Sequence, residues 1–145
     1  MGMDKLEHIG IAVKNIEKSN KLFAKLLGRE HYKIEDVPSE GVRTSFFDMG
    51  NLKIELLEAT SPDSPIAKFI EKKGEGVHHL AFEVTDIRKS IKEYAAMDFA
   101  LVSSVPKAGA DSKMICFLHP KSTNGVLLEL CQSIGPLSDE YVRTD

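Results

Sequence analysis

The chain has 145 residues, of which 42% are hydrophobic and 28% charged, and its net charge is −3. This length is that of one ordinary domain, and the composition is that of soluble globular proteins. The slight acidity argues against a general nucleic-acid-binding surface, and no apolar stretch or signal-peptide pattern predicts a membrane segment or export. We therefore expect a cytoplasmic protein that binds neither nucleic acid nor membrane.

The first part of the chain predicts one helix and four strands. Residues 5–13 alternate in polarity, which is typical of a strand, and His8, Gly10 and Ala12 share one of its faces. Asn15 is expected to cap a helix that ends near Leu27, before Gly28. The helix is expected to pack through its apolar residues, which are Ile16, Leu22, Phe23, Leu26 and Leu27. Further strands are predicted at 32–37, 42–49 and 52–58, with a turn at 38–41.

The second part predicts the same order of elements after a linker. The linker, about 59–75, contains a short helix over 65–73 that has Pro65 in its first turn. A strand at 77–85 leads through Asp86 into a helix that ends near Met97, and the remaining strands are expected at 100–105, 113–118 and 126–132. We predict one domain over 1–145, made of two βαβββ modules at about 5–58 and 76–132, followed by a polar tail at 133–145.

An internal repeat supports this division. Aligning His8 with His79, an offset of 71 residues, gives seven identities in twenty-one positions. The ends of the modules also match, because Glu55 and Glu129 each lie between aliphatic residues at an offset of 74. The extra residues of the second module are expected in the loop 121–125.

Each module therefore supplies one histidine on its first strand and one glutamate on its last. Imidazole and carboxylate groups together suit Zn, Co, Ni, Mn or Fe, so His8, Glu55, His79 and Glu129 are candidate ligands of a divalent metal ion. The opposing interpretation is that each is a structural residue, since most single histidines in strands are not ligands. The flanking Ile and Leu residues disfavour that interpretation for the two glutamates, because a carboxylate among core residues needs a partner. Cys116 and Cys131 lie in predicted strands without paired spacing and are expected to be reduced and buried.

Five segments together resemble the vicinal oxygen chelate family, and within it the methylmalonyl-CoA epimerases. They are 8–13, 54–58, 64–69, 78–84 and 119–122. The resemblance spans about 5–132 and implies an α+β fold in which the two modules form a curved mixed sheet around a metal cleft, with helices on the outer face. It places the metal ligands on His8, Glu55, His79 and Glu129. The expected cofactor is a divalent ion, Co²⁺ first, with Mn²⁺, Zn²⁺, Ni²⁺ or Fe²⁺ as alternatives.

The same resemblance implies an isomerase that epimerises methylmalonyl-CoA through an enolate, with Glu129 as the leading base. Some epimerases carry a second base, a glutamate, on the third strand, where this chain has Thr44. That leaves the group on the second face open among Glu40, His119 and water. Thr44, Lys121 and Lys68 are expected to contact the acyl-CoA substrate, and a homodimer is expected. The alternatives are a glyoxalase I-like lyase and a non-catalytic small-molecule-binding protein of the same fold.

Overall fold

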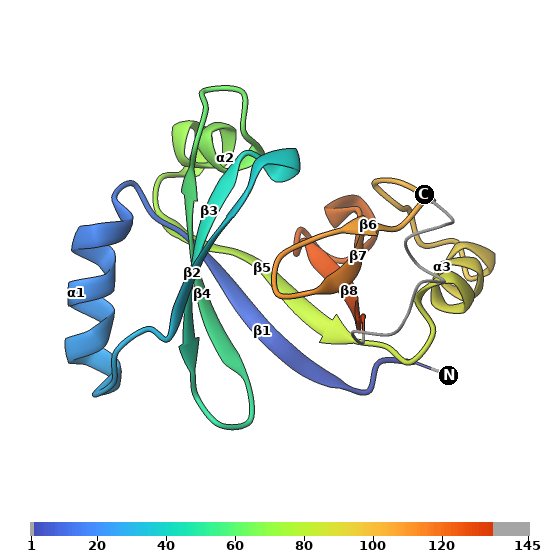
Figure 1. Ribbon diagram of the computed structural model, residues 1–145. Coiled ribbons are helices and arrows are strands. Elements are labelled where there is room, and N and C mark those ends of the chain that lie inside the picture. Colours follow the sequence, from blue (N-terminus) through green and yellow to red (C-terminus); the bar gives the residue numbers. More distant parts are fainter. Residues whose placement is uncertain (1, 135–145) are drawn as a thin grey trace. The chain divides into compact units, whose positions relative to one another are not determined.

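The computed structural model describes residues 2–134 and contains the two predicted βαβββ modules (Figure 1). The polar tail predicted at 133–145 therefore lies outside the described residues except for its first two positions. The first module is drawn in blue to green and the second in yellow to red. Within residues 2–134, no helix is both long and apolar enough to cross a membrane. The α+β class and the order of elements within the modules are confirmed.

The first module contains one helix and four strands in the predicted order. These are β1 (Lys5–Ala12), α1 (Ile16–Leu27), β2 (Lys33–Val37), β3 (Val42–Asp48) and β4 (Lys53–Ala59). The strands are hydrogen-bonded in the order β2-β3-β4-β1, and only the β1–β4 pair is parallel. A 3₁₀ turn, η1 (Pro38–Glu40), joins β2 to β3 where a turn was predicted.

Helix α2 (Pro65–Lys73) links the modules, and the second module repeats the arrangement of the first. It consists of β5 (Gly76–Glu83), α3 (Ile87–Ala96), β6 (Lys107–Ala108), β7 (Lys113–Leu118), η2 (Pro120–Ser122) and β8 (Leu128–Ser133). Its strand order is β5-β8-β7-β6, and β5 and β8 are parallel.

One predicted strand is wrong. Residues 100–105 form no strand, and only Leu101 makes an isolated bridge, to Leu118. The pairing next to β7 is made instead by Lys107–Ala108. Apolar residues such as Val102 and Val105 suggested a strand, but both side chains are 57% exposed and so do not pack on the core.

The chain divides into two compact units whose boundaries cut through β1 and β5. One unit, here called the first-module unit, is His8–His78, and the other, the second-module unit, combines the residues up to Glu7 with those from His79 onward. Within the second-module unit, the N–H of Asp4 donates to the carbonyl of Glu83 at 2.8 Å. Each unit therefore contains the start of the first strand of the other module.

The two module helices start in the same way. The side chains of Asn15 and Asp86 accept from the N–H groups three residues later, as predicted for N-caps. A second contact repeats as well: Glu58 Oε2 accepts from Ile16 N–H at 2.9 Å, and Gln132 Oε1 accepts from Ile87 N–H at 2.8 Å. Each helix N-terminus is thus tied to the last strand of its own module, which satisfies donors that the helix itself cannot.

Helix α1 packs on the sheet with a narrower face than predicted. Its partners Phe23, Ala24 and Leu27 surround a buried cluster of Val13, Phe47 and Leu56. The prediction that Leu22 and Leu26 pack with them is wrong, because these side chains are 62% and 70% exposed. At 100° per residue, positions 16, 20, 23, 24 and 27 share one face, and Leu22 and Leu26 lie beside it.

Candidate metal-binding and active site

One face of each module carries the candidate ligands and the other carries the helix. On β4, Leu56 belongs to the cluster under α1, so Glu55 points to the opposite face. On β8, Leu130 packs with Ile91 and Tyr94 of α3, so Glu129 likewise points away from the helix. We call this opposite face of each module the ligand face, as expected from the alternation of polar and apolar residues.

In the first module, His8 and Glu55 form a buried pair. Their side chains extend from the parallel neighbours β1 and β4, and His8 Nδ1 lies 3.1 Å from Glu55 Oε2. Both residues are only 4% exposed. A carboxylate removed from water to this extent needs a partner, and the imidazole beside it supplies one.

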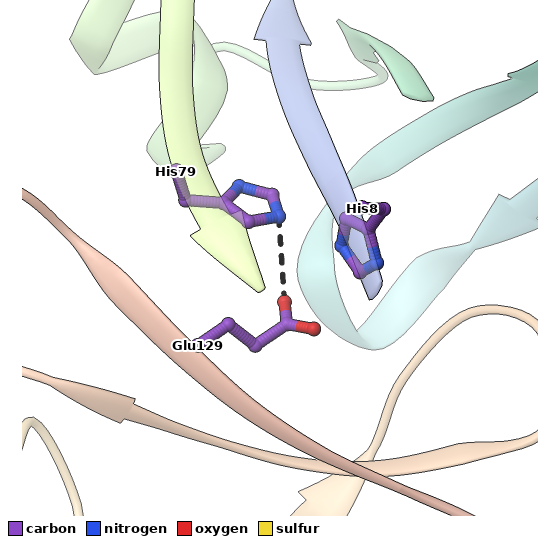
Figure 2. A group of neighbouring side chains, drawn as sticks. All are labelled: His8, His79 and Glu129. Atoms are coloured by element: carbon purple, nitrogen blue, oxygen red, sulfur yellow. Dashed lines mark ion pairs between the residues drawn. The ribbon is translucent and has the colours of Figure 1, made fainter. Parts of the chain in front are cut away.

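In the second module, His79 and Glu129 form the corresponding pair. They extend from the parallel neighbours β5 and β8 and point toward one another, with 3.5 Å between His79 Nε2 and Glu129 Oε1 (Figure 2). Their exposed fractions are 6% and 5%. The structure therefore brings His8 together with Glu55, and His79 together with Glu129.

A phenylalanine lies directly opposite each glutamate, a feature that the sequence analysis missed. Phe46 of β3 pairs with Glu55, and Phe117 of β7 pairs with Glu129. The ring of His79 meets that of Phe117 edge-on, at 5.9 Å between centres. Phe46 and Phe117 are related by the same offset of 71 as the histidines, so the repeat alignment held the signal. Each glutamate therefore has an aromatic side chain as its cross-strand neighbour on the ligand face.

The donor sets fit a divalent metal ion. Each pair offers one imidazole nitrogen and one carboxylate oxygen, buried and within 4.8 Å of one another. Nitrogen with oxygen donors suits Zn, Co, Ni, Mn or Fe and does not choose among them. An ion would also replace the close His–Glu contact as the compensation for the buried negative charge.

The other predicted site residues have different settings. Thr44 is 1% exposed and lies on the ligand face of β3, two residues from Phe46. Lys121 is exposed in η2, where its N–H donates to His119 Nδ1 at 3.0 Å, and Lys68 is exposed on α2. Glu40 is partly buried in η1.

The buried ionisable residues of the second-module unit include Cys131 and Glu7. Cys131 is 0% exposed and stands two residues beyond Glu129 on the ligand face, in a small cluster with Ala81 and Ile115. Burial, and then the charges of Glu129 and Glu7, raise the pKa of this thiol well above its usual range. Both cysteines are free and buried, as predicted. Glu7, at 9% exposure, is a buried carboxylate that the sequence analysis did not single out.

His78, the neighbour of His79 in sequence, has a structural setting. Its ring packs edge-on against Phe69 of α2, at 5.0 Å between centres. Burial, with a smaller contribution from the charge of Lys73, lowers the pKa of His78 to about 4. The ring of His78 is therefore neutral at physiological pH.

The chain is similar in sequence to known proteins along most of its length. A profile of the glyoxalase/bleomycin resistance protein/dioxygenase superfamily matches residues 7–117. The ethylmalonyl-CoA/methylmalonyl-CoA epimerase of Cereibacter sphaeroides is 42% identical over 132 residues, covering 88% of this chain and 97% of that protein. The mitochondrial methylmalonyl-CoA epimerase of Dictyostelium discoideum is 39% identical over 131 residues, covering 90% of this chain and 79% of that protein.

Solved structures of methylmalonyl-CoA epimerases have the same fold as this chain. A single-residue variant of the methylmalonyl-CoA epimerase of Streptomyces coelicolor, in complex with 2-nitronate-propionyl-CoA, superposes with a TM-score of 0.86 at 31% identity, covering 92% of this chain and 97% of that one. A methylmalonyl-CoA epimerase in complex with methylmalonyl-CoA and NH₄⁺ matches with the same score, identity and coverage. The chain belongs to the glyoxalase/bleomycin resistance protein/dioxygenase superfamily and, within it, to the family of the methylmalonyl-CoA epimerases.

Proposed function

We propose that this protein is a metal-dependent isomerase that epimerises methylmalonyl-CoA at C2 through an enolate. The observation that carries the proposal is its identity of 36–42% to methylmalonyl-CoA epimerases along at least 88% of the chain. The buried His–Glu pair at the same place in both modules supports the metal dependence.

The chemistry of the substrate explains what the site must do. The reacting carbon lies between a thioester carbonyl and a carboxylate, and its proton is only weakly acidic. A divalent ion would supply a Lewis acid where negative charge develops as the proton leaves. His8, Glu55, His79 and Glu129 are the residues that we assign to hold this ion.

The assignment of all four ligands to one ion rests on the repeat and the family. Within each module the two donors are already paired, buried and directed at each other. Two ligands bind an ion weakly and leave most of its coordination positions open. Four protein ligands would hold the ion more firmly, and any coordination position that they do not fill would stay open to the oxygens of the substrate.

We assign Glu129 the role of base on one face of the substrate. It is 5% exposed, and a carboxylate beside the ion is close to the carbon that loses the proton. Glu129 would help to hold the ion when it is bound, and its carboxylate would take up the proton. Thr44 cannot act as a carboxylate base, so we assign it to substrate contact only, and proton return on the second face falls to another group.

Lys121 and Lys68 are proposed as contacts for the phosphates or the carboxylate of the acyl-CoA. Both are exposed, as a group that meets a large solvated ligand must be. Co²⁺ as the native ion, a location in the cytoplasm and a homodimer also remain predictions. Light scattering that gave a mass near that of one chain, 16.1 kDa, at micromolar concentration would contradict the dimer.

Proton exchange tests the proposed function directly. Metal-loaded protein would be incubated with methylmalonyl-CoA in heavy water, with an EDTA-treated sample as control. We expect metal-dependent deuterium at C2 together with loss of stereochemical purity. Metal-loaded protein that incorporates no deuterium would refute the epimerase, and methylglyoxal with thiols would then test the lyase. Protein that binds no metal and gains no activity from added Co²⁺ or Mn²⁺ would favour a non-catalytic binding protein.

A further inference from the structure

Two lysines share the ligand face of the first module with His8 and Glu55. Lys33 of β2 lies directly opposite Phe46, and Phe46 lies directly opposite Glu55, so these residues form one row across the strands. Lys53 precedes Glu55 by two residues on β4 and lies opposite His8. Directly opposed residues of neighbouring strands point to the same face, and so do alternate residues of one strand.

The ammonium groups of Lys33 and Lys53 both lie over the ring of Phe46. Lys33 Nζ lies 4.6 Å from the centre of the ring and Lys53 Nζ lies 5.7 Å from it. Both distances are within the range of cation–π attraction, about 6 Å. Phe46 is 0% exposed and both lysines are partly buried. Lys33 Nζ also lies 3.4 Å from Glu35 Oε1, which orients it further.

The second module keeps the phenylalanine and the glutamate, but its ligand-face lysines lie elsewhere: Lys107 is opposite Ile115 and Lys113 is opposite Ser133. At the offset of 74 that relates Glu55 to Glu129, Lys53 corresponds to Leu127. The edge strand β6 pairs only with Met114 and Ile115 and ends short of Phe117, so no residue of β6 takes the place of Lys33. Two lysines beside the phenylalanine that faces the glutamate are therefore a feature of the first module, and the second module folds without lysines in that position.

We propose that Lys33 and Lys53 form the subsite for the free carboxylate of a dicarboxylic acyl thioester, and that this pair selects malonyl-type substrates over monocarboxylic ones. The proposal deepens the proposed function and rests on it. A carboxylate has two oxygens with about four acceptor positions, so it can meet these donors and an ion together.

Position favours the carboxylate over the phosphates of coenzyme A. Lys53 is two residues from Glu55, about 7 Å along the strand at 3.4 Å per residue. The carboxylate is attached to the reacting carbon itself, whereas the whole pantetheine arm separates the phosphates from the thioester. Because Lys53 lies this close to a candidate metal ligand, we expect it to contact the carboxylate on the reacting carbon and not the distant phosphates.

Isothermal titration calorimetry with two ligands can distinguish binding of the free carboxylate from binding of the coenzyme A phosphates. Malonyl-CoA and propionyl-CoA carry the same coenzyme and differ in the free carboxylate. Each would be titrated into the Co²⁺-loaded wild type and into Lys33→Met, Lys53→Met and Lys53→Arg. Methionine keeps an unbranched stem over Phe46 and removes the charge. Lys113→Met is the matched control, because Lys113 stands on the ligand face of β7 with its Nζ bound to Ser133 Oγ at 2.7 Å.

We expect Lys53→Met and Lys33→Met each to raise the Kd for malonyl-CoA about ten- to a hundredfold, the range for a hydrogen bond to a charged group. The Kd for propionyl-CoA should not change, Lys53→Arg should restore most of the affinity, and Lys113→Met should behave as wild type. Equal losses for both ligands would overturn the carboxylate assignment in favour of the phosphates. Unchanged affinity of both lysine variants for malonyl-CoA would overturn the subsite.

Failure of the subsite can be told from failure of the proposed function. Proton exchange on methylmalonyl-CoA would be measured for the same wild-type preparation. Wild type that exchanges the proton while the variants bind malonyl-CoA normally refutes the subsite alone. Wild type that neither exchanges the proton nor binds malonyl-CoA refutes both. Circular dichroism of each variant shows whether it is folded. Lys33→Met and Lys53→Met test the subsite separately, so one folded variant is enough for the test.

Discussion

Replacing single ligand histidines should show whether one metal ion is shared by the two modules. The candidate ligands are 4–6% exposed in the folded protein, so the unfolded chain cannot reproduce their arrangement, and the ion should stabilise the folded state alone. At free Co²⁺ a hundred times the Kd, this stabilisation is about 2.7 kcal/mol. For a chain of this length a change of 1 kcal/mol moves the Tm by about 3 °C, so we expect a rise of about 8 °C over the EDTA-treated protein.

The prediction is that His8→Ala and His79→Ala each abolish the whole rise. A shared ion loses a ligand in either variant, whereas two separate ions would leave about half of the rise in each. The assay is thermal unfolding by circular dichroism, with Co²⁺ or EDTA, for both variants and for His119→Ala. His119 is an exposed histidine and serves as the control, so its variant should keep the full rise. A full rise in His79→Ala would refute the ligand assignment, and half rises would refute the shared ion.

Three further predictions follow from the contacts described above. Glu129→Gln should lower the rate of proton exchange at C2 about a hundredfold or more, the usual contribution of a positioned base, and exchange at the wild-type rate in heavy water would exclude Glu129 as that base. Glu58→Ala and Gln132→Ala should each lower the free energy of unfolding by about 1 kcal/mol, measured in urea, because each leaves a helix-starting N–H without its acceptor. Because the pKa of His78 is lowered to about 4, the unfolded chain takes up a proton below about pH 6.5 while the folded protein does not, so stability should fall as the pH drops from about 6.5 towards 4. His78→Gln should lose that part of the fall, and an NMR titration that protonated His78 near pH 6.5 would contradict it.

The elements of the fold were predictable where periodicity and caps agree. Asn15 and Asp86 mark the helix starts in the sequence and cap them in the structure. The sixth strand was misplaced because exposed Val102 and Val105 resemble strand residues locally, while β-pairing depends on the neighbouring strand. The packing of Leu22 and Leu26 was mispredicted because a helix can carry more apolar residues than its partner surface covers.

The candidate site was predictable one module at a time. Alternation on β4 and β8 placed Glu55 and Glu129 away from the helices, and the structure pairs each with the histidine of its module. The rings of Phe46 and Phe117 were missed because their pairing with the glutamates depends on the register between β3 and β4 and between β7 and β8. Register is set by turns and packing that a single sequence does not specify, although the common offset of 71 was a usable hint.

The division of β1 and β5 between the two units bears on how such a protein can originate. The unit His8–His78 takes in the first residues of β5, and the other unit takes in the residues before His8. A fragment cut at the repeat boundary would therefore carry a strand end that belongs to the other unit and lack one of its own. A single-module ancestor would have needed two identical chains that exchanged these ends. Joining the two copies in one chain makes that exchange of strand ends intramolecular. Each module can then change independently, as Lys33 and Lys53 of the first module illustrate.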